Sequence, residues 1–460
     1  MLGKKFFVNH LFLRVLIISA FACCLPFFIC FSETKSISFE EGERVIIFAP
    51  HPDDEIIGCA GIIQECLSKK IDVYVVFLTN GDHNQFAFKA YTRRIILNPS
   101  DYIKMGQVRK KESTSAAKIL GLPLENLIFL GYPDAGTLPI WTKYWNSKQP
   151  FENFLTRTRY VPYPDDVSFG NAYLPENIQA DLTKILLKIM PSKIFVSHPA
   201  DLNPDHRALF NFVQLSLLDC RGKINPEVYC YLVHAKNFPK PKGLFPQQTI
   251  KIPSEIEKYG TCVNFFLTET QEKNKLVALD CFKSQLIGRK NWTFSFLRKN
   301  EVFQIIHPVL FVRNNSSEIS IDAQSQEEIS EEESLKHTKL YNLRLTYDQQ
   351  DLVFQFLYDK KVIEKEFGVK IYVYGWKEKI PFSLMPKIAV DIKMDGTFTV
   401  YKNEKNISVK DISIKKTQNT FTFKIPYSLL DEPDFIFVGG ESKLGLLTLD
   451  YFPWKVIDIE

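Results

Sequence analysis

The chain has 460 residues and a formal net charge of +4, with 45% hydrophobic and 24% charged residues. This length exceeds what one hydrophobic core usually serves, so at least two folded units are expected. The composition is that of a globular protein and excludes a disordered chain or one with many membrane spans. With so small a net charge and no block of Lys and Arg, we expect no nucleic-acid partner.

The segment 1–35 differs from the rest of the chain. Lys4 and Lys5 precede an apolar run that carries no charge from Val15 to Ser32. Such a run is typical of an export signal or of a single membrane anchor. A buried core helix is the alternative, which Pro26 and the terminal position disfavour. The basic N-terminal side predicts that the remaining chain lies outside the cytoplasm, either periplasmic or membrane-anchored.

Residues 40–307 alternate between short apolar runs and helical patterns. Strands are expected over 45–49, 73–78, 127–130 and 194–197, and helices over 55–69, 105–120, 176–190, 205–218 and 268–283. Continuous apolar strands that alternate with helices predict an α/β fold, a Rossmann-like and mostly parallel sheet with helices on both faces. Active sites of such sheets lie at the carboxyl ends of the strands. The loops after the first four strands should therefore converge.

The remaining sequence predicts a linker and a second domain. Residues 314–336 are polar, with an acidic run over 327–333, and indicate a solvated linker. Short strand patterns such as 352–356 and 369–373 predict a β-sandwich-like domain over 337–460. Six aromatic residues of this domain could stack on sugars or pack in its core: Tyr372, Tyr374, Trp376, Tyr451, Phe452 and Trp454. The domain is accordingly a carbohydrate-binding module, or else a spacer or docking module.

Two polar clusters follow the first and fourth predicted strands. The first contains His51, Asp53, Asp54 and Glu55. An N-cap explains one Asp at a helix start, but three neighbouring carboxylates repel one another unless a cation is present. The second cluster runs from His198 to His206 and holds two His and two Asp. Two His and one Asp with an open fourth position form the ligand set of a catalytic zinc site.

These clusters carry a family resemblance. The segments His51-Pro52-Asp53-Asp54-Glu55 and Asn203-Pro204-Asp205-His206 resemble the two signatures of the PIG-L/LmbE family of zinc-dependent N-deacetylases. Weaker similarities follow in the family's order, at Thr79-Asn80-Gly81-Asp82, at Arg109 with Glu112, at Gly131-Tyr132-Pro133-Asp134 and at Lys283-Ser284-Gln285. The similarity extends over residues 42–307.

The resemblance implies roles for the matching positions. His51, Asp54 and His206 would bind Zn²⁺, and Asp53 would be the general base for a zinc-activated water. Such ligands also accept iron, manganese or cobalt. The implied reaction removes acetyl from an N-acetylated sugar, an N-acetylglucosamine-type conjugate or glycolipid.

Two further positions match those where family members contact sugar hydroxyls. They are Arg109 and Asp134, for which a surface ion pair or a loop cap is the alternative.

One position departs from the family pattern. Many members have His where this chain has Asn203, and that His assists the oxyanion or the leaving group. Asn donates hydrogen bonds but is no proton donor. We therefore expect His198 to substitute for the missing His, and Asp205 to orient a different partner.

The competing hypothesis is a catalytically inactive sugar- or metal-binding protein on the same fold. The intact set of His51, Asp53, Asp54 and His206 argues against it.

Overall fold

The computed structural model describes residues 36–313, 317–326, 338–348, 350–359, 367–393, 395–408, 412, 414–417, 419–445 and 447–460. The predicted signal or anchor over 1–35 and the acidic run over 327–333 lie outside these residues. Residues 36–460 form one compact unit. Among the described residues, no helix is both long and apolar enough to cross a membrane.

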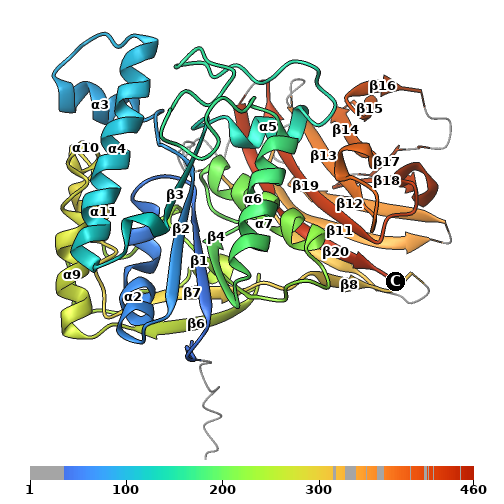
Figure 1. Cartoon of the computed structure of the whole chain (residues 1–460). Helices are drawn as coiled ribbons and strands as arrows, with labels where there is room; N and C mark the ends of the chain where they lie inside the picture. Colours follow the sequence, from blue (N-terminus) through green and yellow to red (C-terminus); the bar gives the residue numbers. More distant parts are fainter. Residues whose placement is uncertain are drawn as a thin grey trace, which may run out of the picture. The chain divides into compact units, whose positions relative to one another are not determined.

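A seven-stranded sheet forms the first part of the described chain, in the order β3-β2-β1-β4-β5-β7-β6 (Figure 1). Its strands are β1 (Arg44–Ala49), β2 (Asp72–Thr79), β3 (Leu127–Tyr132), β4 (Lys193–Ser197), β5 (Glu227–Tyr231), β6 (Thr261–Phe266) and β7 (Asn300–Ile305). The five neighbouring strands β3, β2, β1, β4 and β5 run parallel to one another. Strand β7 runs antiparallel to both of its neighbours, β5 and β6. The predicted Rossmann-like, mostly parallel sheet is thus confirmed.

Helices cover both faces of this sheet because its strands are apolar on both faces. Val45 and Ile47 of β1 pack into a core shared with helices α2 (Asp54–Ser68), α4 (Pro99–Leu120) and α9 (Glu269–Leu279). Ile46 and Phe48 point the other way, into a core shared with α6 (Pro175–Ile189) and α7 (Pro204–Asp219). Successive side chains of a strand alternate between faces, which accounts for this division. Five shorter helices are α3 (Gln85–Thr92), α5 (Thr137–Lys143), α8 (Ser254–Glu257), α10 (Lys283–Leu286) and α11 (Lys290–Phe294).

The C-terminal part is antiparallel except for β8, which lies parallel to β20, and it builds a β-sandwich, as expected. One sheet has the order β10-β20-β19-β13-β14-β15-β16 with β8 on β20, and the other has the order β17-β18-β12-β11-β9. Their strands are β8 (Val309–Phe311), β9 (Ile319–Asp322), β10 (Gln324–Ser325), β11 (Leu340–Asp348), β12 (Asp351–Tyr358), β13 (Phe367–Trp376), β14 (Lys387–Lys393), β15 (Phe398–Lys402), β16 (Lys405–Ile407), β17 (Ile414–Lys416), β18 (Thr420–Pro426), β19 (Phe435–Leu444) and β20 (Leu447–Ile459). Strands β9 and β10 lie within the stretch predicted as a linker. Ile319 and Ile321 account for β9, because both are buried in the sandwich core.

The aromatic residues considered as a sugar platform are buried instead. Tyr372, Tyr374, Trp376, Tyr451, Phe452 and Trp454 are each at most 5% exposed. Trp141 of α5 contacts Tyr374, Phe437 and Trp454 with ring centroids 5.4–6.1 Å apart. The rings of Tyr374, Phe437 and Trp454 therefore join the sandwich to the α/β part. Of the two alternatives that the sequence left open for the aromatic residues, packing holds and sugar stacking does not.

Candidate active site

The loops that follow β1 to β4 converge at the carboxyl end of the sheet, as the strand pattern predicted. They border a cavity of about 380 Å³, to which the segments after β5 and around α10 and α11 also contribute. Its wall consists of His51, Asp53, Asp54, Ile57, His83, Asn84, Gln85, Phe86, Arg109, Asp134, Asn203, His234, Gln285, Arg289 and Trp292. The sheet topology therefore brings together most of the predicted site residues.

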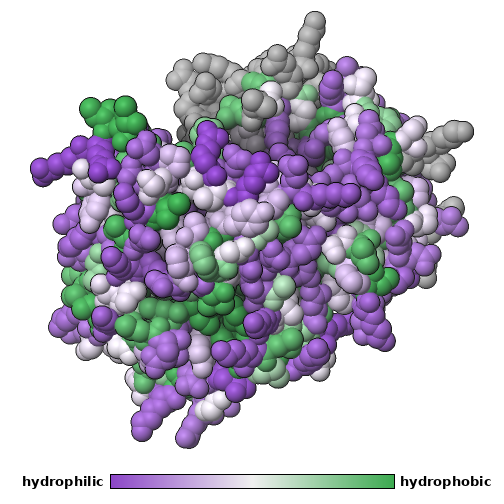
Figure 2. All heavy atoms as spheres, turned by 45° about the horizontal axis from the view of Figure 1, so that its top comes forward, coloured by the Kyte–Doolittle hydropathy of each residue, from purple (hydrophilic) through white to green (hydrophobic). Residues whose placement is uncertain are grey.

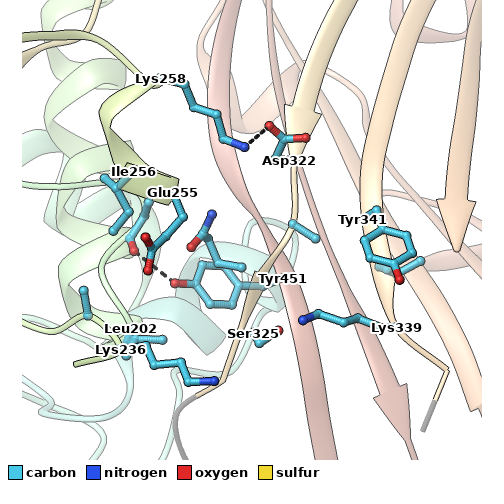
Figure 3. A pocket seen from close by; sticks show the side chains of 15 residues that line it. Leu202, Lys236, Glu255, Ile256, Lys258, Asp322, Ser325, Lys339, Tyr341 and Tyr451 are labelled. Carbon is cyan, nitrogen blue, oxygen red and sulfur yellow. Dashed lines mark hydrogen bonds and ion pairs between the residues drawn. The ribbon is translucent and has the colours of Figure 1, made fainter. Parts of the chain in front are cut away.

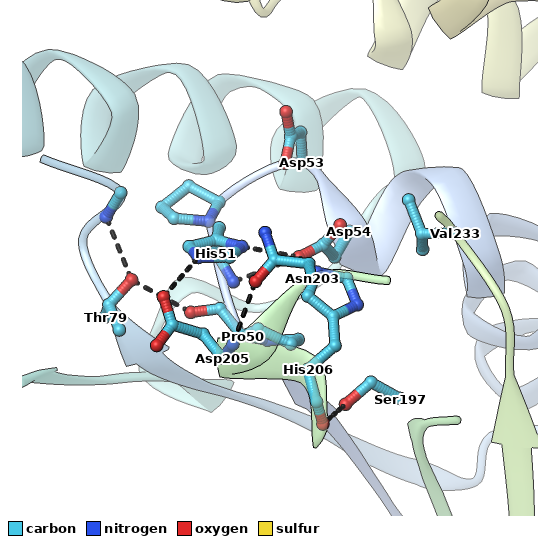
Figure 4. A network of polar contacts seen from close by, with 12 residues as sticks. Pro50, His51, Asp53, Asp54, Thr79, Ser197, Asn203, Asp205, His206 and Val233 are labelled. Carbon is cyan, nitrogen blue, oxygen red and sulfur yellow. Dashed lines mark hydrogen bonds and ion pairs between the residues drawn. The ribbon is translucent and has the colours of Figure 1, made fainter. Parts of the chain in front are cut away.

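The three predicted metal ligands meet at one carboxylate oxygen. Asp54 Oδ2 lies 3.2 Å from His51 Nδ1 and 3.1 Å from His206 Nε2. All three residues are buried, and their ligand atoms lie within 4.8 Å of one another. Figure 4 shows the side chains of His51, Asp54 and His206 turned toward one another. Two imidazoles and one carboxylate at this spacing can hold one divalent cation.

The outward nitrogens of both imidazoles face carboxylates. His51 Nε2 lies 3.2 Å from Asp134 Oδ1 and 3.4 Å from Asp205 Oδ2. His206 Nδ1 lies 3.2 Å from Asp201 Oδ2. A carboxylate on the outer nitrogen holds the proton there and turns the lone pair of the inner nitrogen toward a metal.

The surroundings of the His206 ring show whether this group of residues suits a metal ion. His206 is fully buried, and neither of its ring nitrogens makes a well-directed hydrogen bond within the described part of the chain, despite the nearby carboxylates. Burial disfavours the charged ring, but Asp201 and Asp54 outweigh burial and raise the pKa of His206 to about 9. A proton therefore balances the buried charge when no metal is bound, and a divalent cation would replace it. The residues present fit a metal.

Asp53 lies next to this group in a conformation that L-residues rarely adopt. Its φ is 124°, in the region that favours glycine. Its side chain is 17% exposed and lines the cavity. Burial raises the pKa of Asp53 to about 6, although the nearby Arg109 guanidinium lowers it. A carboxylate with this pKa is suited to accept a proton near neutral pH.

Glu55 and Arg109 hold the Asp53 turn in place. Glu55 Oε2 accepts the Asp53 backbone N–H at 2.8 Å, and Glu55 Oε1 accepts the Ser113 hydroxyl at 2.7 Å. Arg109 donates to Pro52 O at 2.6 Å and to Asp53 Oδ1 at 3.1 Å. These bonds offset the backbone strain at Asp53 and fix the direction of its carboxylate.

The structure places both predicted substrate-binding residues on the cavity wall. Besides its bonds to the Asp53 turn, Arg109 donates to Gly81 O at 3.0 Å, and its Nε has no hydrogen-bond partner among the described residues. Asp134 Oδ2 accepts the His83 backbone N–H at 2.9 Å. Burial raises the pKa of Asp134, but His51 and Arg109 outweigh it and hold the carboxyl well below its usual range. Both residues thus support neighbouring site groups as well as facing the cavity.

Asn203 and Asp205 have distinct positions at the start of α7. Asn203 Oδ1 accepts the Asp205 backbone N–H at 2.8 Å as the N-cap of the helix. Its amide nitrogen points toward the side on which Asp53 lies (Figure 4). Asp205 accepts backbone N–H groups from Ala135 at 2.6 Å and Thr137 at 3.1 Å, and its Oδ2 faces His51. Asp205 therefore lies where it can orient His51.

The structure contradicts the proposed substitution by His198. The Ala200 backbone N–H donates to His198 Nδ1 at 2.9 Å, so Nε2 carries the proton and donates to Gln304 Oε1 at 2.8 Å. Burial lowers the pKa of His198 to about 4. Its loop turns the ring toward β7 rather than toward the cavity, because both ring nitrogens are satisfied there. His198 has no place in the site.

Asp201 and His234 also lie at the site, although the sequence patterns indicated no role for either residue. Asp201 Oδ2 accepts the backbone N–H groups of Val233 at 3.0 Å and His234 at 2.9 Å. The His234 ring stacks on Trp292 at 5.3 Å and meets His206 edge-on at 4.9 Å. The position of His234 after a buried strand, at the same sheet edge, was the signal that could have found it.

The β-sandwich supports the loop that carries Asp201. Tyr451 of β20 donates from its hydroxyl to Ala200 O at 3.0 Å. The Arg207 guanidinium lies 4.0 Å from the centre of the Tyr451 ring and donates to Asp201 O at 2.8 Å. Figure 3 shows Tyr451 reaching from its strand into a cavity of about 370 Å³ that is also lined by Leu202. The sandwich thus contacts the backbone of the residue that orients His206.

We expect Tyr451→Phe to weaken metal binding by a few-fold, up to about tenfold, because it frees the Ala200–Asp201 backbone behind His206. Metal titration of the full chain measures this effect. Tyr358→Phe is the matched control, since the Tyr358 hydroxyl donates to Thr417 O at 3.2 Å within the sandwich. Equal affinities for the two variants would show that the sandwich does not support the site.

Asp82 gives a prediction for the pH dependence of stability. It is 2% exposed and accepts the Tyr163 hydroxyl at 2.6 Å. Burial, with a smaller effect of Asp134, raises the pKa of Asp82 to about 7. The folded protein therefore keeps this proton more strongly than the unfolded chain, and stability falls as pH rises from about 4 through 7.

We expect Asp82→Asn to abolish this decrease in stability with rising pH. The difference in unfolding free energy between the variant and the unmodified protein should therefore shift by about 2–4 kcal/mol in favour of the variant from pH 4 to pH 8. Denaturant unfolding with a chelator present measures it. Asp165→Asn, at an exposed position, should leave the slope unchanged. Parallel pH profiles for Asp82→Asn and the unmodified protein would contradict the prediction.

Comparisons with known proteins agree with the resemblance in sequence. Residues 46–216 match the family model described as PIG-L: GlcNAc-PI de-N-acetylase. No curated protein matches the chain.

Several solved structures are similar. GalB, the 4-carboxy-2-hydroxymuconate hydratase from Pseudomonas putida KT2440, has 15% identity and a TM-score of 0.38, over 58% of this chain and 97% of that one. The N,N'-diacetylchitobiose deacetylase from Pyrococcus horikoshii has 18% identity and a TM-score of 0.37, over 66% and 95%. The zinc inhibited form of teicoplanin deacetylase Orf2 has 14% identity and a TM-score of 0.37, over 57% and 98%.

At these identities and scores, the solved structures assign no activity to this chain. The family match runs from within β1 into α7 and contains His51, Asp54 and His206. Residues 46–216 of this chain are therefore a domain of the PIG-L family.

Proposed function

We propose that this protein is a metal-dependent N-deacetylase that hydrolyses the acetamido group of an N-acetylated sugar conjugate. The observation that carries the proposal is the placement of Asp53, a partly exposed carboxylate with a raised pKa, beside the group of His51, Asp54 and His206. Both border one cavity of about 380 Å³. This is the arrangement that hydrolysis of an unactivated amide needs.

A bound Zn²⁺, the metal that we propose, would acidify a water and polarise the amide carbonyl. Asp53 then takes the proton of the attacking water and returns it to the amine nitrogen when the C–N bond breaks. Acetate and the free amino sugar leave. Arg109 keeps the Asp53 carboxylate aimed at the cavity through its bonds to Pro52 O and Asp53 Oδ1.

Asn203 is suited to stabilise charge rather than to move protons. Its Oδ1 is committed to the helix cap, so the amide N–H groups are the part that can donate to a developing oxyanion. We propose that Asn203 performs this half of the role of the family's His. In this scheme Asp53 is both base and acid, since His198 is turned away from the cavity.

The cavity wall also carries groups suited to a sugar. Trp292 offers an aromatic surface beside His234, and the amide and charged groups of Gln285 and Asp134 lie on the same wall. Polar groups that converge around an aromatic residue suit hydroxyl recognition and orient a ligand. We propose an N-acetylglucosamine-type conjugate, in an envelope glycan or a glycolipid outside the cytoplasm, as the substrate class.

Acetate release from a panel of N-acetylglucosamine conjugates tests the proposal, with N-acetylated amino acids and acetate esters as comparison substrates. Release from the sugar amides, lost on chelation, is the expected result. Release from amino acids alone would identify a different amidase. A bound metal without any acetate release would favour the alternative, a catalytically inactive sugar- or metal-binding protein.

A further inference from the structure

Helix α3 and the segment after it expose large apolar side chains close together. Phe86 is 91% exposed, Ile95 is 87% exposed and Ile96 is 78% exposed, and Tyr91 between them is 42% exposed. Figure 2 shows a hydrophobic cluster that projects from the corner where α3 lies in Figure 1. Scattered exposed apolar residues are common, but such a cluster on one projecting element marks a contact surface. We call Phe86, Tyr91, Ile95 and Ile96 the α3 patch.

The α3 patch stands on a packed base. Phe88 of the same helix is buried against Tyr102 and Met105 of α4. Asn84 caps the helix by accepting the Ala87 backbone N–H at 3.3 Å, and its Nδ2 donates to Gln285 Oε1 at 2.7 Å. The buried side of the helix is sufficient to hold it against α4. The exposed apolar side chains are not needed for that packing and are available to contact another molecule.

The charge around the α3 patch favours one kind of partner. Residues 85–97 contain three basic side chains, Lys89, Arg93 and Arg94, and no acidic one. Arg93 and Arg94 are exposed, and Arg94 Nη1 also contacts Asp101 Oδ1 at 2.9 Å. Projecting apolar side chains among cations fit the interface of a bilayer, where the apolar groups enter between lipids and the cations meet anionic headgroups.

The α3 patch is continuous with the cavity. Phe86 lines the active-site cavity together with Asn84 and Gln85, at the base of the same helix. We propose that the α3 patch docks the protein on an anionic membrane surface, with the cavity mouth beside the lipid headgroups. A lipid-linked substrate then reaches the site without leaving the bilayer. The docking itself does not depend on the reaction that the site performs.

Vesicle binding tests the docking surface. The chain from residue 36, which forms a compact unit, removes any contribution of the apolar leader. We expect it to sediment with vesicles of phosphatidylcholine and phosphatidylglycerol and to bind phosphatidylcholine vesicles less. The triple variant Phe86→Ser, Ile95→Ser and Ile96→Ser should reduce binding by at least about tenfold.

Two further variants separate the causes. The first is a control that replaces apolar residues outside the α3 patch, each 54–70% exposed, by Phe266→Ser, Leu310→Ser and Leu384→Ser. This control variant should bind vesicles as the unmodified chain does. Lys89→Gln with Arg93→Gln should weaken binding to the anionic vesicles only. An unchanged thermal midpoint shows that each variant is folded.

Three results would overturn the docking surface. The first is that the unmodified chain binds neither kind of vesicle. The second is that the triple variant and its control lose vesicle binding equally. The third is that the triple variant loses self-association of the chain and not vesicle binding. The last result would identify the α3 patch as a contact between copies of this chain.

Discussion

Replacing Asp53 by Asn should lower kcat for acetate release by roughly 10²–10⁴ while one metal ion per chain remains bound. The reason is chemical: an amide at this position would keep the shape of the side chain but could accept no proton from the attacking water. Asn has nearly the same size and shape as Asp, and the bond from the Asp53 backbone N–H to Glu55 Oε2 does not depend on the side chain, so the turn should persist. KM should change little, since the carboxylate is proposed to act on the proton and not on the sugar.

Steady-state kinetics with metal analysis of the same sample measure the Asp53→Asn effect. Asp280→Asn is the control, because Asp280 is a half-buried residue outside the cavity wall that pairs with Lys283. If Asp53→Asn kept most of its activity with the metal in place, another group would have to be the base. A loss of the metal together with the activity would assign Asp53 to metal binding instead.

Substitution of His51 should abolish stoichiometric metal binding and activity, and so should substitution of His206. The described residues contain three groups that could hold an ion: His51 with Asp54 and His206, Asp201 with His206 and His234, and His51 with Asp134 and Asp205. The first group is the one we assign, because both imidazoles turn a nitrogen toward Asp54 Oδ2. Losing one of three protein ligands should weaken affinity by more than about a hundredfold, beyond the effect of an outer-shell residue.

The variants His51→Gln and His206→Gln distinguish these groups. If both variants lose the metal, the ion lies with His51, Asp54 and His206, the group that we assign. A His206→Gln variant that keeps the metal would place it with Asp134 and Asp205, and a His51→Gln variant that keeps it would place it with Asp201 and His234. His198→Gln is the control from the same loop and should retain the metal, since His198 Nε2 donates to Gln304 Oε1.

Much of the fold could be predicted because its strands are continuous apolar runs. Val45 and Ile46 belong to cores on opposite faces of the sheet, and an uninterrupted apolar pattern is the sequence sign of that double burial. The antiparallel strands β6 and β7 were harder to predict. β6 mixes buried and half-exposed residues and lies at the sheet edge, so its pattern resembles that of a loop.

The core of the site could be predicted because its residues are close in sequence to strand ends. His51, Asp53 and Asp54 follow β1 directly, and His206 lies in the first turn of α7. The placements of His198 and His234 could not be predicted. Which way a histidine turns depends on partners distant in sequence, such as Gln304 for His198 and Trp292 for His234.

The aromatic residues of the sandwich illustrate the same limit. Trp376 and Trp454 lie in stretches of β13 and β20 that are buried on both faces, and a strand pattern alone does not say whether a face meets sugar, solvent or another domain. Trp376 Nε1 donates to Asp219 Oδ1 at 3.1 Å across the contact with α7. Only the packing of the two parts shows that this face is covered.

Acetate release by the full chain, before chelation, after chelation and after return of one equivalent of Zn²⁺, tests the central claim most directly. An N-acetylglucosamine conjugate is the substrate, and the Asp53→Asn variant runs in parallel. We expect acetate release that disappears when the metal is removed, returns when the metal is restored, and stays absent in Asp53→Asn. Release that persists in metal-free protein, or a metal-loaded protein that releases no acetate from any sugar amide, would contradict it.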